Sequence, residues 1–95
     1  MAVQKQPDLI EQWIEPHPWR RGVEEARLRD PKISVWALIG HLRMVDGDLD
    51  RVAEDYRIPR EAVEAAVAYH ARYRSEIDAR LARVASSDGA IPSRS

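Results

Sequence analysis

The sequence predicts an all-α fold, a compact domain of three helices that has short extended segments before them and a long helix at the carboxyl end. The chain has 95 residues, which suffices for one small domain with a modest core. From residue 33 onward, apolar residues recur at helical spacing, whereas prolines and glycines interrupt the part before it. Residues 60–85 contain no proline or glycine and are rich in alanine, arginine and glutamate, which favour helix.

Composition and charge exclude several classes of protein. Apolar residues make up 44% of the chain and charged residues 33%, which is typical of a soluble globular protein. The 15 basic and 16 acidic side chains give a net charge of -1, so any basic surface must be local. The chain has no cysteine, which excludes disulfides and thiolate zinc sites. It shows no secretion signal and no membrane-spanning apolar run, so we expect a cytoplasmic protein without membrane contact.

The first third of the chain predicts little helix. Residues 1–12 are polar and lack a strong period, which predicts a flexible N-terminus in which a short turn at Leu9 to Trp13 is the one candidate element. The domain is expected to span residues 13–85. Its first part contains Pro16, Pro18 and Gly22, which are incompatible with a long helix and favour short extended pieces or a small hairpin.

Two helices are predicted next. Residues 33–45 are almost all apolar, so this helix should be central, with Ser34 placed to cap its first turn. Gly47 breaks the pattern, and Asp48 can cap a second, short helix that ends at Tyr56. The side chains expected to pack together in the core are Trp36, Leu38, Ile39, Leu42, Val52, Ala53, Tyr56, Val63 and Val67.

A tight turn and a long helix complete the domain. Pro59 disfavours helix at Ile58 but suits the first turn of a helix, so a third helix is predicted over residues 60–85. The apolar helix, short helix, turn and long helix together form a helix-turn-helix arrangement of the homeodomain-like kind. Residues 86–95 are expected to be a disordered tail.

The second half of the predicted long helix carries an apolar stripe spaced by four, four and three residues. The stripe consists of Tyr73, Ile77, Leu81 and Val84. Because the helix is longer than the two before it, this stripe has no obvious partner within the chain. We therefore expect these four side chains to form a homodimer or partner interface.

No residue set for catalysis or metal binding is present. Asp46, Asp48 and Asp50 alternate as at the start of a calcium loop, but the glycine and the final glutamate of such a loop are misplaced or missing. The three histidines are too scattered to form a zinc-ligand pair on one helix. We therefore expect a protein that is not an enzyme and takes no metal, cofactor or small-molecule ligand.

A local surplus of positive charge lies between residues 20 and 43. Six cations there face three carboxylates, Glu24, Glu25 and Asp30. Such a surplus suits contacts with phosphate, although a solvated face is the alternative interpretation. The side chains expected to contact phosphate are Arg20, Arg21, Arg27, Arg29 and Lys32.

The start of the third helix offers a second candidate contact with DNA. Arg57 and Arg60 lie where a helix-turn-helix protein reads base edges in the major groove. Glu61 and Glu64 lie beside them and would be repelled by phosphate. A base-reading role for the two arginines therefore competes with pairing to these carboxylates.

Three stretches of the chain form a distinctive pattern. They are Lys32-Ile33-Ser34-Val35-Trp36 with Leu38 and Ile39, then Asp46-Gly47-Asp48-Leu49-Asp50-Arg51-Val52-Ala53-Glu54-Asp55-Tyr56, then Ile58-Pro59-Arg60-Glu61-Ala62-Val63-Glu64-Ala65-Ala66-Val67-Ala68-Tyr69 with Ile77-Asp78-Ala79-Arg80-Leu81. With them, residues 14–81 resemble the DUF433 family, small bacterial and archaeal antitoxin-like domains often encoded beside a PIN-like nuclease. The family has a Gly-Thr-Arg-Ile-Pro-Val segment where this chain has Asp30-Pro31-Lys32-Ile33-Ser34-Val35.

The resemblance implies a winged or homeodomain-like helical fold, a DNA-binding antitoxin function and a protein partner. We therefore predict a non-enzymatic antitoxin-like protein of a type II toxin-antitoxin module that binds a PIN-like nuclease toxin, forms a homodimer and has operator DNA as a candidate ligand. Two alternatives remain open. One is a stand-alone helix-turn-helix regulator, and the other is a structural adaptor that binds no DNA.

Overall fold

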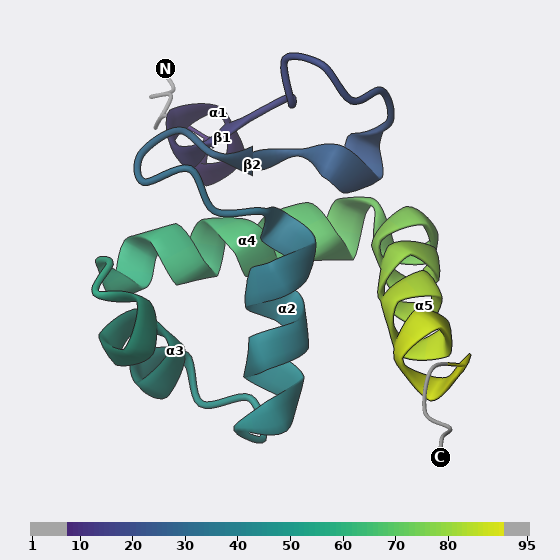
Figure 1. Cartoon of the computed structure of the whole chain (residues 1–95). Helices are drawn as coiled ribbons and strands as arrows, with labels where there is room; N and C mark the ends of the chain where they lie inside the picture. The colour runs from purple at the N-terminus through teal and green to yellow at the C-terminus, as the bar shows by residue number, and fades with distance from the viewer. Residues whose placement is uncertain (1–7, 91–95) are drawn as a thin grey trace.

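The computed structural model describes residues 8–90 (Figure 1). The elements in chain order are α1 (Leu9–Trp13), β1 (Ile14–Glu15), the 3-10 turn η1 (Val23–Glu25), β2 (Arg27–Leu28), α2 (Val35–Met44), α3 (Leu49–Tyr56), α4 (Arg60–Arg72) and α5 (Arg74–Ala90). The predicted mostly helical class is confirmed, together with the expected short extended pieces. Helix α4 crosses the middle of the molecule, with the N-terminal elements on one side and α3 and α5 at its two ends.

The fold begins earlier than predicted. Asp8 caps α1, since its carboxylate accepts a hydrogen bond from the backbone N–H of Ile10 at 3.0 Å. Ile10 is buried and α1 packs against α4, so the domain includes residues before 13. Strands β1 and β2 pair antiparallel, with Ile14 opposite Leu28. Residues 1–7, the first part of the predicted flexible segment, lie outside the described residues.

Helices α2 and α3 follow the sequence signals closely. Ser34 occupies the N-cap position of α2, but its side chain makes no capping hydrogen bond, contrary to expectation. The Asp48 carboxylate does cap α3, accepting a hydrogen bond from the backbone N–H of Arg51 at 3.1 Å. Arg57 ends α3 in the left-handed conformation, with φ of 57°. The predicted tight turn then leads into α4.

The prediction of one long helix over residues 60–85 is wrong. The chain leaves helical geometry at Tyr73, with φ of -124° and ψ of 45°, and α5 turns away from α4 (Figure 1). The turn brings Ile77 of α5 into the core, where its side chain is 0% exposed. Burying such a side chain contributes about 1.5 to 3 kcal/mol, which offsets the helical hydrogen bonds lost at the turn. Helix α5 then continues to Ala90, beyond its predicted end, and residues 91–95 lie outside the described residues.

The turn also corrects the expected partner interface. The apolar stripe of α5 has a partner within the chain, because Ile77 is buried and both Tyr73 and Leu81 pack against the same core. A β-carbon added at Gly40 of α2 would lie 3.1 Å from Cδ2 of Leu81, so the glycine permits the close approach of α5. Of the four stripe residues, Val84 is partly exposed and lies outside the core cluster.

Helix α4 is covered on more than one side. It packs against α1, α2 and α3, and no charged or polar residue of the described chain is buried in the core around it. The buried side chains of α4 are Ala62, Val63, Ala65, Ala66 and Tyr69. In a helix-turn-helix protein this helix would enter the major groove, but here its middle lies between α1 and α2.

Candidate nucleic-acid interface

Glu15 is the centre of a cluster of positive side chains on the two-stranded sheet. The strand register places Glu15 opposite Arg27, whose Nε lies 2.8 Å from Oε2 of Glu15. Lys32 Nζ lies 3.0 Å from the same oxygen, and Arg29 Nη1 lies 3.8 Å from the other carboxylate oxygen. Hydrogen bonds from Lys32 and then Arg27 lower the pKa of Glu15. Three cations therefore share one carboxylate, which leaves a surplus of positive charge.

The local backbone explains why these cations meet. The N–H of Leu28 donates to the carbonyl of Ile33 at 2.8 Å, which closes the turn after β2 and returns Lys32 to the sheet. The Arg29 guanidinium donates to the carbonyl of Glu11 in α1, from Nε at 3.2 Å and from Nη2 at 3.1 Å. The first contact fixes the backbone of the turn, and the second holds the Arg29 side chain against α1.

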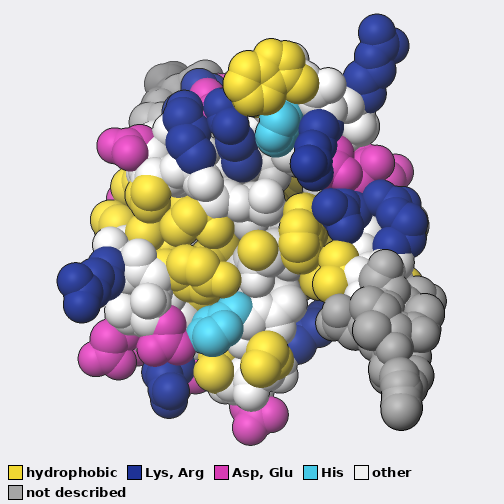
Figure 2. All heavy atoms as spheres, viewed as in Figure 1, with side chains coloured by type: hydrophobic (Ala, Val, Ile, Leu, Met, Phe, Trp, Pro, Cys, Tyr) yellow, Lys and Arg dark blue, Asp and Glu magenta, His cyan; other side chains and the backbone are white. Residues whose placement is uncertain are grey.

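The loop of residues 16–22 carries an exposed tryptophan beside two arginines. The Trp19 side chain is 83% exposed. Nδ1 of His17 accepts hydrogen bonds from the backbone N–H groups of Trp19 at 3.0 Å and Arg20 at 3.1 Å, so the imidazole organises the loop tip. The loop ends at Gly22, with φ of 107°, a conformation that favours glycine. In Figure 2, Lys and Arg side chains surround hydrophobic and histidine side chains over these N-terminal elements.

A pocket of about 850 Å³ opens beside this loop. Its apolar wall contains Ile10, Ile14, Val23, Ala26 and Tyr69, and its charged lining contains Arg20, Arg21, Arg29, Glu11 and Glu15. Burial is the main cause that raises the pKa of Tyr69 to about 12, so its hydroxyl keeps its proton and donates to the Val23 carbonyl at 2.7 Å. The pocket therefore combines an apolar wall with positive charge at its surface.

The arginines of the loop differ in their partners. Arg20 Nη1 lies 3.6 Å from Glu25, whose other carboxylate oxygen accepts a hydrogen bond from Arg80 of α5 at 3.0 Å. Arg21 is exposed and has no ion-pair partner among the described residues. Arg21 is therefore the loop cation most accessible to an added phosphate.

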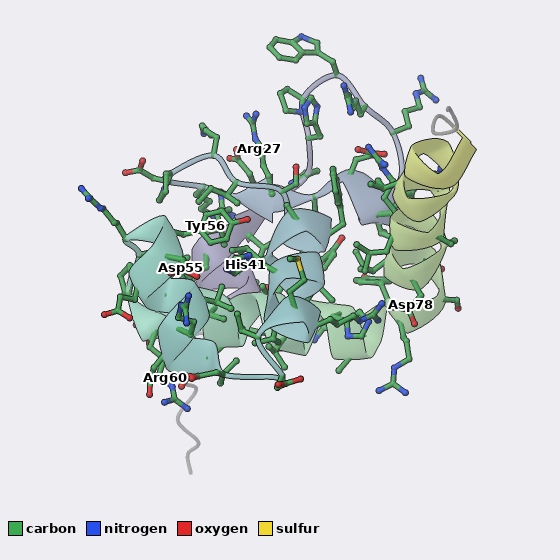
Figure 3. All side chains as sticks on the ribbon, turned by 60° about the horizontal axis from the view of Figure 1, so that its bottom comes forward. Arg27, His41, Asp55, Tyr56, Arg60 and Asp78 are labelled. Carbon is green, nitrogen blue, oxygen red and sulfur yellow. The ribbon has the colours of Figure 1, made fainter. Side chains whose placement is uncertain are left out.

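The arginines near the start of α4 do not join this surface. Figure 3 places Arg60 and Arg27 on opposite sides of the ribbon. Arg60 Nη1 lies 3.0 Å from Asp50 and its Nε lies 3.0 Å from Glu64, and these hydrogen bonds, Asp50 first, raise the pKa of Arg60. Two carboxylates thus occupy the guanidinium that was expected to read bases. Arg57 is exposed at the end of α3.

Two histidine-carboxylate pairs link the helices. His41 Nε2 lies 2.7 Å from Asp55 (Figure 3), and His70 Nε2 lies 2.8 Å from Asp78. The hydrogen bond from the histidine is in each pair the main cause that lowers the pKa of the aspartate. Arg51 also contacts Asp55, and Arg43 contacts Asp78. Within residues 8–90, no group of three His, Asp or Glu side chains could hold a metal ion.

Sequence reasoning found the five N-terminal cations but missed the carboxylate at their centre and the aromatic beside them. Glu15 precedes residues 20–43 in the sequence, and strand pairing brings it among the cations. For Trp19 the signal is its place between Pro18 and Arg20 in a proline-rich loop, where a tryptophan has little chance of burial.

Comparison of the chain with protein family models, with curated proteins and with solved structures finds no match. No helix in the described part of the chain combines the length and the apolar character needed to cross a membrane.

Proposed function

We propose that the protein is a non-catalytic, antitoxin-like protein that binds nucleic acid through the surface formed by its 16–22 loop and its two-stranded sheet. The observation that carries this proposal is the convergence of Arg27, Arg29 and Lys32 on Glu15, next to Arg20 and Arg21 of the loop. Three of the five cations share Glu15, Arg20 pairs with Glu25, and Arg21 has no ion-pair partner among the described residues. This gives a local positive surface on a chain whose net charge is -1. Phosphate is the ligand that such a surface attracts most strongly.

The contacts within this surface favour phosphate binding further. The carbonyl of Glu11 holds the half-exposed Arg29 side chain, so little of its freedom remains to be lost when a ligand binds. Arg27 is 19% exposed and engaged by Glu15, so it is the less accessible cation. A guanidinium also offers several donors in a plane, which matches the oxygens of a phosphate group. Contacts to the nucleic-acid backbone, rather than to base edges in the major groove, are the proposed basis of binding.

The start of α4 supports a different role. Glu61 is exposed there, and Asp50 and Glu64 already pair with Arg60. Because carboxylates near phosphate are repelled, sequence reading by Arg60 is not part of the proposal. A stand-alone regulator that reads its operator through α4 is accordingly the weaker alternative.

The protein-binding half of the proposal rests on the resemblance to the DUF433 family and on one exposed side chain. Met44, at the end of α2, is 79% exposed, and such side chains are common in protein interfaces. We propose a PIN-like nuclease as the partner. Co-expression with the nuclease of a neighbouring reading frame tests this, and Met44→Glu should reduce co-purification. Failure of the wild-type protein to co-purify with it would contradict the partner proposal.

Salt-dependent binding tests the nucleic-acid half. Labelled oligonucleotides, both duplex and single-stranded, should bind at low salt, and affinity should fall steeply between about 50 and 200 mM salt. Arg21→Gln should lower affinity for every sequence and reduce the slope of log affinity against log salt by about 0.7 to 0.9. Arg57→Gln is the matched control, because Arg57 is also an exposed arginine without an ion-pair partner among the described residues.

The outcomes separate the candidate surfaces. A loss for Arg21→Gln and none for Arg57→Gln supports the N-terminal surface. The reverse result would show that nucleic acid contacts the start of α4 instead, and it would contradict binding at the N-terminal surface. If the wild-type protein binds neither form of nucleic acid at low salt, the structural-adaptor alternative takes its place.

A further inference from the structure

We propose that the pocket beside the 16–22 loop binds an unpaired nucleotide, so that the protein prefers single-stranded to duplex nucleic acid. This inference rests on the proposed function and assigns the substrate class of the same surface. The bound base would stack on Trp19 and enter the pocket, and its phosphates would contact Arg20, Arg21 and Arg29.

The first support is the position of Trp19. An indole that is 83% exposed contributes little to the core, yet the backbone beneath it is organised by two hydrogen bonds to His17. Pro16 and Pro18 restrict the backbone further, because the proline ring fixes φ. An aromatic ring in a defined position next to arginines is the arrangement on which proteins stack unpaired bases.

The second support is the chemistry of the pocket. The pocket is open to solvent, its lining includes both apolar and charged side chains, and its volume of about 850 Å³ exceeds what one nucleotide needs. Arg20 and Arg21 come from the loop, whereas Arg29 follows β2, so cations line the pocket from two segments. Glu11 and Glu15 line it as well, but Glu15 is already engaged by Arg27 and Lys32. A ligand that is planar and apolar on one side and anionic on the other complements this lining.

Duplex nucleic acid fits the same features less well. Its bases are already stacked, so contact with Trp19 would require unstacking of a base step, which costs a few kcal/mol. Helix α4, which could enter a groove, packs against α1, α2 and α3, and its exposed first turn carries Glu61, which phosphate repels. An unpaired base can stack on Trp19 without unstacking of a duplex and without entry of α4 into a groove. The geometry therefore favours single strands.

Four labelled ligands test the proposal in one anisotropy series. They are a 12-residue oligo-dT, a duplex of the same length, an abasic 12-residue oligomer with the same phosphates, and an acidic peptide of the same charge. The oligo-dT should bind about tenfold more tightly than the duplex and the abasic oligomer. Trp19→Ala should lower oligo-dT affinity about tenfold, within the range expected for loss of one stacked base, and leave abasic binding almost unchanged.

Two variants control for unspecific effects. Trp19→Phe keeps an aromatic face and should recover most of the oligo-dT affinity. Ser75→Ala changes an exposed residue of α5 that does not line the pocket and should change no affinity. Since both Trp19 and Ser75 are exposed, all three variants should keep the wild-type unfolding midpoint.

Each of the other possible results would overturn one specific part of the proposal. Equal affinity for duplex and oligo-dT, or equal loss of oligo-dT and abasic binding in Trp19→Ala, overturns the single-strand inference and leaves nucleic-acid binding intact. Tighter binding of the acidic peptide than of oligo-dT, dependent on Trp19, would make the pocket a protein-docking site. If no oligonucleotide binds the wild-type protein, the proposed function and this inference fail together.

Discussion

The Tyr69 hydroxyl donates a hydrogen bond to the backbone carbonyl of Val23 at 2.7 Å, across 46 positions of sequence. This contact joins the central helix α4 to η1, directly after the 16–22 loop, and both residues line the pocket. The ring of Tyr69 also packs against that of Tyr73, with centroids 4.8 Å apart, where the chain turns into α5. One tyrosine thus connects the pocket, the central helix and the turn.

Tyr69→Phe should destabilise the protein by about 0.5 to 1.5 kcal/mol. The substitution removes one partly buried hydrogen bond, whereas the Val23 carbonyl keeps the backbone N–H of Ala26, 3.2 Å away, as a donor. Urea denaturation measures the change. Tyr73→Phe provides the control, since no hydrogen bond from its hydroxyl is present in the described structure, and an equal loss there would show that the Val23 contact is unimportant.

Stability should fall as the pH rises from 10 to 12. The folded protein holds the pKa of Tyr69 at about 12, mainly by burial, while the unfolded chain ionises this tyrosine near its ordinary value of 10.0. Unfolding therefore releases a proton in this range, and the stability due to the folded-state shift is lost as pH increases. Guanidinium denaturation at several pH values measures the slope, which should be shallower in Tyr69→Phe. An unchanged slope would contradict the raised pKa.

Acid should weaken the cluster around Glu15. Lys32 and Arg27 lower the pKa of Glu15 in the folded protein below its ordinary value of 4.5. The ionised Glu15 therefore stabilises the fold above about pH 4.5, and this stabilisation is lost as the pH falls through the pKa of Glu15 in the folded protein. Denaturation between pH 6 and 2 should show this loss in the wild type. In Glu15→Gln the acid dependence should be smaller.

Glu15→Gln should also strengthen nucleic-acid binding although it destabilises the fold. The substitution removes the one carboxylate shared by Arg27, Arg29 and Lys32, so the surface gains one positive charge. Affinity at low salt should rise and its salt dependence should become steeper. Weaker binding by a variant that remains folded would show that Glu15 positions these cations for the ligand rather than competing with it.

Ile77→Ala should cost about 2 to 5 kcal/mol, because the Ile77 side chain is fully buried between α5 and the core. Val84→Ala, farther along α5 at a partly exposed position, should cost much less. Thermal unfolding of both variants tests the position of α5. Similar small effects would mean that α5 extends from α4 as the sequence alone suggested.

Local signals predicted most of α2, α3 and the start of α4. Asp48 caps α3 through its own side chain, and Pro59 precedes α4, so neighbouring residues decide these boundaries. The turn at Tyr73 was not predictable in this way, since residues 60–85 contain no helix breaker. Burial of Ile77 against the core overrides the helix propensity there, and such packing is visible only in three dimensions.

The candidate surface was also predictable only where residues close in sequence form it. Positive residues close in sequence, such as Arg27 and Arg29, were identified from composition. The pocket requires Tyr69 of α4 to lie beside the 16–22 loop, an association over about 50 positions that no periodic pattern encodes. The pairing of Arg60 with Asp50 likewise depends on how α3 and α4 pack.

The glycine at position 40 limits how this architecture can vary. Since a β-carbon there would lie 3.1 Å from Cδ2 of Leu81, a methyl group requires the Leu81 side chain to shift slightly, and a larger side chain requires a larger shift. The size of residue 40 therefore limits how closely the 17-residue helix α5 can pack against α2. A designer who wanted α5 to detach and recruit a second protein would begin at this position, without altering the positive surface.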